Sequence, residues 1–397
     1  MNNSGKQSSK RFWRNMITII AVGIVLVATV YFGKKYKASQ KTVEITAFYN
    51  QLSEDDYIDF AKKLEKSIHT KNPEVFDNSV DIASLFGFSK RELAQSFKKR
   101  KGIEFLQPYL KIGSSISSQL LYPNDFKYTN FYKEDGIPHI VFRLYRPDFI
   151  NFIDFTLDIK KDKIVIDNMY DFYSGILFSE MASDLYHKAI NLRQSNIANM
   201  DIYQSIKNQL FLGLYEEAYN SLVAIPNAER SPFHYQFLLI AASNCDDDEK
   251  LIQVISDMKA HKPNDKRLDT YLNFHESLIH GDLDKLNTAI DNLKKYVGED
   301  TIFDQYRGIL FNLQSEFEKA GPFFDRVITE NPDFFGGYYY KLYNMLLRDK
   351  ENEALSVIAE MKERFSISKE DFVFDLQEEY KEFTNSKAFQ KIFKSAE

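Results

Sequence analysis

The seven histidines are the first side chains to test for metal binding, and one pair among them is closely spaced. His275 is followed directly by Glu276, and His280 lies five residues after His275. Two histidines that share a zinc ion on one helix are four residues apart, whereas a separation of five turns the second ring roughly 140° away from the first. The pair cannot share a metal ion, so the sequence predicts no zinc site here.

Other motifs that carry chemistry are absent or incomplete. Three consecutive aspartates at 246–248 lack the glycine and the bidentate glutamate of a calcium loop. Negative charge is favourable at the start of a helix, so we expect a turn that opens one. No glycine-rich phosphate loop follows a strand, and no Gly-x-Ser-x-Gly motif occurs. We therefore expect no catalytic residue, no bound metal and no cofactor.

Polar residues in the predicted strands are the candidates for an enzymatic site, which is the alternative to a non-enzymatic function. An aspartate with a histidine or a tyrosine, facing an apolar pocket, could perform acid–base chemistry. The candidates are Tyr128, His139, Arg143, Asp154 and Asp167. They alternate with large apolar residues, as side chains do when one face of a sheet is in solvent. We therefore expect these candidates on a solvent-facing surface.

Composition narrows the function classes further. A chain of 397 residues is too long for one ordinary core, so we expect two domains. The 57 acidic and 51 basic residues give a net charge of −6, which supplies no basic surface for nucleic acid. The single cysteine, Cys245, can form neither an internal disulfide nor a thiolate metal site. Stability must therefore come from packing.

An apolar segment near the N-terminus predicts a membrane anchor. Residues 16–33 carry no charge, and 18 helical residues span roughly 27 Å, close to the thickness of a hydrocarbon core. The exit Tyr31-Phe32-Gly33 lacks the small residues of a signal-peptide cleavage site. We therefore expect an uncleaved transmembrane helix between an N-terminal tail (1–15) and a linker (34–43).

The orientation of this anchor is weakly determined, because lysine and arginine are balanced on its two sides. A short tail with four basic residues and no acid is hard to translocate, so we expect it in the cytoplasm. This predicts a single-pass protein, placed in a bacterial inner membrane with its C-terminal domains in the periplasm. The alternative leaves those domains in the cytosol, as in a mitochondrial import receptor.

Residues 44–178 have the pattern of an α+β domain. Apolar residues at helical spacing predict a helix over 47–68, and helical stretches follow at 90–99 and 105–121. The period then changes to that of strands, which turn residues such as Glu134-Asp135-Gly136 separate. The predicted strands are Asp125–Tyr132, Pro138–Tyr145, Phe149–Lys160 and Lys163–Tyr170.

This order, with helices before four curved strands that end in Ile164-Val165-Ile166-Asp167 and continue to Gly175, resembles the cone-shaped fold of nuclear transport factor two and ketosteroid isomerase. Members of that fold are enzymes, ligand pockets or dimerisation modules. The resemblance therefore leaves open an enzymatic domain, a small-ligand site and a homodimer contact.

From residue 199 onward the pattern is helical and repeats itself. A 34-residue frame starting at Thr301 has small residues at Gly308 and Ala320, large apolar ones at Phe324 and Val327, and Pro332 at its end. Frames starting at 199, 232, 267, 301 and 335 are 33, 35, 34 and 34 residues apart. These features resemble the tetratricopeptide family, which implies five helix pairs over 199–371. A connecting helix (179–198) would precede them and a capping helix (372–397) would follow.

The same resemblance implies a concave groove lined by the first helix of each pair. The groove positions of the family are occupied here by Tyr203, Lys207, Gln236, Tyr271, His275, Gln305, Tyr339 and Tyr343. Aromatic and amide side chains suit an extended peptide or a helix. For Tyr338-Tyr339-Tyr340, packing between repeats is an equal alternative. The family's clamp for a C-terminal carboxylate is absent.

The sequence thus predicts a membrane-anchored, non-enzymatic scaffold or assembly protein that binds a protein or peptide partner in this groove. It predicts no nucleic-acid partner. The alternative is a small-ligand-binding or enzymatic α+β domain, with the repeats as a docking arm.

Overall fold

A computed structural model describes residues 52–81, 85, 111–120, 122, 125–146, 149–160, 162–181, 197–226, 230, 233–245, 247–376 and 379–393. The predicted tail, membrane helix and linker (1–43) lie outside the described residues, as does the helix predicted at 90–99. In the part of the chain that is described, no helix is both long and apolar enough to cross a bilayer. The contacts reported below lie within one compact unit, residues 57–397.

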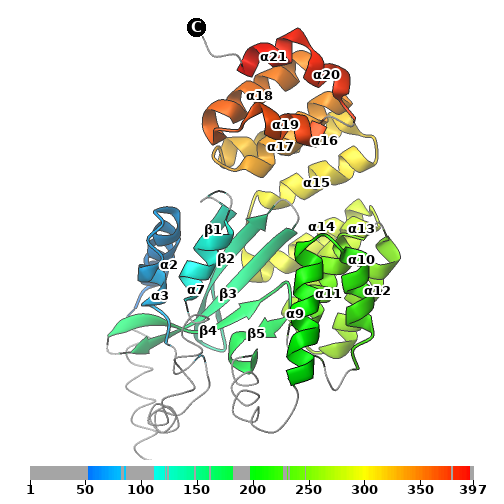
Figure 1. The fold of residues 1–397 in the computed structure, drawn as a ribbon. Coiled ribbons are helices and arrows are strands. Elements are labelled where there is room, and N and C mark those ends of the chain that lie inside the picture. Colours follow the sequence, from blue (N-terminus) through cyan, green and yellow to red (C-terminus); the bar gives the residue numbers. More distant parts are fainter. Residues whose placement is uncertain are drawn as a thin grey trace, which may run out of the picture. The chain divides into compact units, whose positions relative to one another are not determined.

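Helices α2 (Glu54–His69), α3 (Glu74–Asp77) and α7 (Ile112–Gln119) precede the sheet in the described part of the chain (Figure 1). The helix predicted over 47–68 corresponds to α2, and the one predicted over 105–121 is described as α7. Tyr57, Ala61, Leu64 and Ile68 are buried at intervals of three or four residues, so α2 places one apolar face against the domain.

The sheet is an antiparallel meander with the strand order β1-β2-β3-β4-β5. The four long strands, β1 (Phe126–Glu134), β2 (Ile137–Arg146), β3 (Phe149–Lys160) and β4 (Lys163–Asp171), agree with the predicted strands to within two residues at either end. A short β5 (Ile176–Leu177) follows. Asp135 and Gly136 connect β1 to β2 with φ of 51° and 80°, because a two-residue hairpin turn of this type needs positive φ at both positions.

Both faces of the sheet are covered within this unit. On one face Phe142 stacks on Phe126, with ring centroids 4.6 Å apart, and Phe76 of α3 meets Phe155 edge to face at 5.4 Å. On the other face Val141 and Phe152 belong to one apolar core with the helices that follow the sheet. The expectation of a solvent-facing surface on this sheet is therefore wrong.

In the described residues, the ten helices from α9 to α18 follow the sheet in consecutive pairs (Figure 1). The first helices of the pairs are α9 (Ile197–Phe211), α11 (His234–Ser243), α13 (Lys266–Ile279), α15 (Ile302–Leu313) and α17 (Phe335–Leu347). The second helices are α10 (Tyr215–Val223), α12 (Asp248–His261), α14 (Leu283–Val297), α16 (Phe317–Glu330) and α18 (Glu351–Phe365). Each helix packs against the next along the chain, so the predicted helical region after an antiparallel sheet is confirmed.

The pairs recur with the period that the sequence indicates. The second helices begin at residues 215, 248, 283, 317 and 351, which are 33, 35, 34 and 34 residues apart. The turn inside a pair also recurs, since Gly213, Gly281, Ser315 and Asp349 all have left-handed backbone. At Ser315 the N–H donates to the Asn312 carbonyl and the next N–H donates to that of Phe311, the two bonds of a Schellman motif.

The small residues of the repeat lie where two helices approach closely. Ala218, Ala320 and Ala354 are fully buried. A Cβ at Gly308 would lie 2.7 Å from the Phe324 ring, so α15 and α16 could not pack this closely with a larger residue there.

The C-terminal region forms a second core. Here α17 and α18 pack with α19 (Lys369–Leu376), α20 (Lys381–Asn385) and α21 (Lys387–Phe393). The sequence predicted one capping helix over 372–397. The structure instead has three short helices, because Tyr380 and Ser386 interrupt the helical backbone.

Candidate functional site

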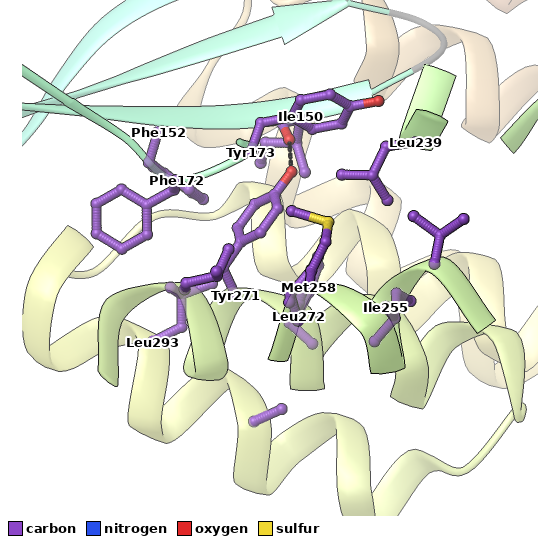
Figure 2. Packing of buried hydrophobic residues seen from close by; sticks show 14 of the residues in the cluster. Ile150, Phe152, Phe172, Tyr173, Leu239, Ile255, Met258, Tyr271, Leu272 and Leu293 are labelled. Atoms are coloured by element: carbon purple, nitrogen blue, oxygen red, sulfur yellow. Dashed lines mark hydrogen bonds between the residues drawn. The ribbon is translucent and has the colours of Figure 1, made fainter. Parts of the chain in front are cut away.

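The middle of the predicted groove is in contact with the chain's own sheet. Tyr271 of α13 is 1% exposed, and its hydroxyl donates to the Ile150 carbonyl at 2.5 Å. Figure 2 shows the ring among Phe152, Phe172 and Tyr173 of the sheet domain. Gln305 of α15 is also 1% exposed, and its amide donates to the Tyr145 hydroxyl at 3.3 Å. Neither side chain is open to a partner.

His275 lies beside this contact. Its ring is 4.6 Å from that of Tyr271, and burial lowers the pKa of His275 to about 4. No described residue forms a hydrogen bond with its Nε2. The predicted groove side chains Tyr271, His275 and Gln305 therefore act in packing. The physical reason is that β2 and β3 carry apolar residues on both faces, and the second face must also be buried.

The first two helix pairs carry three of the predicted groove residues, Tyr203, Lys207 and Gln236. The Tyr203 hydroxyl lies 3.1 Å from Nδ1 of His234, a buried histidine whose pKa burial lowers to about 4. Lys207 is exposed and Gln236 is half-buried. These three side chains remain accessible or partly accessible at this end of the array.

The fifth pair places Tyr339 and Tyr343 one helical turn apart on α17. Their rings are 5.0 Å apart, and their hydroxyl oxygens are 3.4 Å apart. Both are half-buried against the C-terminal core. These two residues belong to the last of the five helix pairs.

Two of the five strand residues considered for acid–base chemistry, His139 and Asp154, are in contact, and Asp154 is fully buried. Its carboxylate lies 2.9 Å from Nδ1 of His139 and accepts hydrogen bonds from the Tyr132 hydroxyl at 2.5 Å and from Arg267 of α13 at 3.0 Å. Burial and the Asp154 carboxylate raise the pKa of Tyr132. Both oxygens of Asp154 are thus engaged, and the network connects β1, β2 and β3 to α13.

Arg143 forms a second buried contact between sheet and helices. One guanidinium nitrogen donates to both carboxylate oxygens of Asp300, at 2.6 and 2.7 Å, and both side chains are nearly inaccessible to solvent. Asp300 Oδ1 also accepts the N–H of Ile302, the first residue of α15, at 3.0 Å. His139, Arg143 and Asp154 were expected in solvent. They are buried instead, because the helical array covers their face of the sheet.

The other two strand candidates take no part in these networks. Tyr128 is half-buried, and its backbone N–H donates to Glu65 of α2. Asp167 lies 3.4 Å from the Lys160 ammonium group. The five candidates therefore do not meet at one site.

A pocket of about 240 Å³ lies in the C-terminal region. Aromatic side chains form much of its wall: Tyr122, Phe335, Tyr339, Phe365 and Phe372. Asp371 also lines it. Among these, only Tyr339 was predicted as a binding residue. The density of tyrosine and phenylalanine in α17 was visible in the sequence, but Tyr122 joins the wall from a segment far away in the chain.

Acidic and histidine side chains were the candidates for metal binding in the sequence. Within the described ranges, no group of three or more His, Cys, Asp and Glu side chains could hold a metal ion. Asp247 accepts the N–H groups of Glu249 and Lys250 and so caps α12, which confirms that the aspartate run opens a helix.

Comparisons with protein-family models, with curated proteins and with solved structures find no match to this chain. The fold therefore defines the class, an antiparallel α+β domain joined to a helical repeat region, and the assignment of function depends on the geometry above.

Proposed function

We propose that this chain is a non-enzymatic scaffold or assembly protein that binds a protein partner at the C-terminal end of its helical array. The observation that carries the proposal is the aromatic pocket that contains Tyr339. Tyr339 lies on α17, the first helix of the fifth pair, and the first helix of each pair lines the groove in tetratricopeptide proteins. The 34-residue period and the recurring left-handed turns support that kinship.

The apolar segment 16–33 supports a membrane anchor in this proposal. The tail 1–15 would lie in the cytoplasm and the folded unit on the other side of a bacterial inner membrane, with a cytosolic unit as the alternative. Self-association through the α+β domain would have to use an edge of the sheet, because its own helices cover both faces.

The alternative is a small-ligand or enzymatic role for the α+β domain, which its resemblance to the cone-shaped fold suggests. One specific observation favours this role. His139, Asp154 and Tyr132 lie within hydrogen-bond distance as an acid–base group would. However, Arg267 also binds Asp154, and the whole group lies against α13, which leaves the scaffold as the better-supported function.

Site-specific photo-crosslinking in native membranes tests the proposal. A photoreactive residue placed at Tyr343, beside the pocket, should give one protein adduct of defined mass. The same residue at Leu313, an exposed position at the end of α15, serves as the control and should give none. Adducts from both positions alike, or from neither, would contradict a partner site at this end of the array.

A further inference from the structure

The wall of the C-terminal pocket combines two kinds of surface. Tyr122 stacks on Phe335 with ring centroids 5.1 Å apart, and Phe365 meets both rings edge to face at 5.4 and 5.5 Å. Leu342, Ile367 and Leu376 add aliphatic surface. A space of about 240 Å³ suits one long side chain rather than a large ligand.

A negative charge lies at the same wall. Asp371 is exposed, and its Oδ2 accepts the N–H and the hydroxyl of Ser368 at 2.9 and 2.7 Å. These bonds lower the pKa of Asp371, so the carboxylate is ionised at neutral pH. The described residues that line the pocket include no basic side chain to neutralise it.

These features select the charge of the occupant. The faces of aromatic rings attract cations, and a carboxylate adds a partner for an ammonium or a guanidinium group. A wholly apolar side chain would fill the space, but it would take water away from Asp371 without giving a compensating bond. Aliphatic surface beside the rings matches the stem of a long basic residue.

We propose that the pocket binds one basic side chain, lysine or arginine, presented by the protein partner. This inference rests on the proposed scaffold function and specifies the chemistry by which the partner is recognised. Asp371 pairs with the cationic group, and Tyr339 and Phe335 contact its stem.

Ligand-observed NMR on the full chain in a neutral detergent tests the proposal. The probes are Nα-acetyl-lysine methylamide, its arginine equivalent and the norleucine equivalent, which has the lysine stem without the charge. At least one basic probe should bind ten times more tightly than norleucine. Equal affinity for all three probes, or binding of none at concentrations of tens of millimolar, would overturn the proposal.

Two variants and a matched control locate the binding. Asp371→Asn keeps an oxygen that can accept a hydrogen bond from Ser368, and it should remove most of the tenfold preference. Tyr339→Ala should lower the affinity for the basic probe several-fold. Tyr343 lies one turn further on and is not in the pocket wall, so Tyr343→Ala should change this affinity by less than twofold. A preference that persists in Asp371→Asn would also overturn the proposal.

The two proposals can fail separately. If the probes show no preference while Tyr343 still crosslinks to a partner, the scaffold stands and the basic side chain is excluded. If the basic probes bind but no partner crosslinks, the pocket is a site for small cations and recognition of a protein partner is excluded.

Discussion

Asp125 is a carboxyl group held almost entirely out of solvent at the start of the sheet, 2% exposed. Its Oδ2 accepts the Tyr122 N–H at 3.1 Å. Burial raises the pKa of Asp125 to about 6, and the Tyr122 bond and Arg143 oppose this only in part. The folded state therefore holds a proton that the unfolded state releases near pH 4, and this carboxyl group lowers stability as pH rises from about 4 to 6.

Asp125→Asn should consequently stabilise the protein at pH 7, by up to about 3 kcal/mol for a shift of roughly two pKa units. The amide retains an oxygen for the Tyr122 N–H. The measurement is the urea midpoint of variant and wild type at several pH values. Their difference should shrink towards pH 4. Comparison at each pH also cancels the opposite effect of His234 and His275, which cost stability as pH falls below about 6.5 because their folded pKa values are about 4. A difference that does not depend on pH would contradict the assignment.

Arg143 and Asp300 form a buried ion pair, and the contribution of each side chain to stability depends on the presence of the other. Removal of one partner leaves an uncompensated buried charge, which costs about 3 to 5 kcal/mol, whereas removal of both costs less than the sum. We expect Arg143→Met to lower the free energy of unfolding by that amount, and Arg143→Met with Asp300→Asn to recover part of the loss. A double-mutant cycle by urea denaturation measures the coupling. Strict additivity would show that the two side chains do not stabilise each other.

For single residues, the sequence indicated which face of the sheet a side chain lies on, but not whether other elements cover that face. Alternation showed correctly that His139, Arg143 and Asp154 share one face of the sheet. It did not show what lies on that face. The better signal was the nearly continuous apolar run of β2 and β3, from Ile140 to Tyr145 and from Ile150 to Phe155, which is typical of strands buried on both faces.

Among the elements, the turn within four of the five helix pairs has the same left-handed backbone with different residues. Gly281 and Gly213 take left-handed φ without cost, whereas Ser315 and Asp349 take it with a Cβ. Ser315→Gly and Asp349→Gly should each stabilise the array by about 1 kcal/mol. Gly281→Ala, where an added Cβ meets only an ordinary contact at 3.8 Å, should destabilise it by a similar amount. Thermal melts of the three variants check this prediction. A loss of stability in Ser315→Gly or in Asp349→Gly would contradict it.

Element boundaries were predictable because their signals are local. The strands are separated by turn residues such as Asp135-Gly136, and the helix pairs repeat small and large residues at fixed intervals. The C-terminal helices were less predictable, because Tyr380 and Ser386 interrupt them without proline or glycine. The pocket was not predictable, since Tyr122 reaches it through the tertiary fold.

In the whole unit, the sheet and the helices approach closely at Gly298, which follows α14. Its φ is +77°, and a Cβ there would lie 2.6 Å from the Thr129 carbonyl oxygen of β1. Gly298→Ala should therefore introduce both backbone strain and a steric clash, and lower the free energy of unfolding by about 2 to 4 kcal/mol. Gly136→Ala is the matched control, because its φ is +80° but nothing lies within 4 Å of the added Cβ. Equal melting temperatures for the two variants would mean that the sheet and helices separate easily.

The contact of Tyr271 and Gln305 with the sheet also has a mechanical consequence. A stack in which each helix pair touches only its neighbours extends and twists under load like a spring. Here the sheet shares a core with the first four pairs and braces them. The fifth pair and α19–α21 form a core of their own, which meets the sheet domain where Tyr122 stacks on Phe335 and where Gly336 lies against Tyr145. Stiffness is therefore uneven along the array. In the proposed arrangement, tension between an anchored N-terminus and a partner at the C-terminal pocket would stretch the last pair first, and the braced part would transmit the force with little change of length.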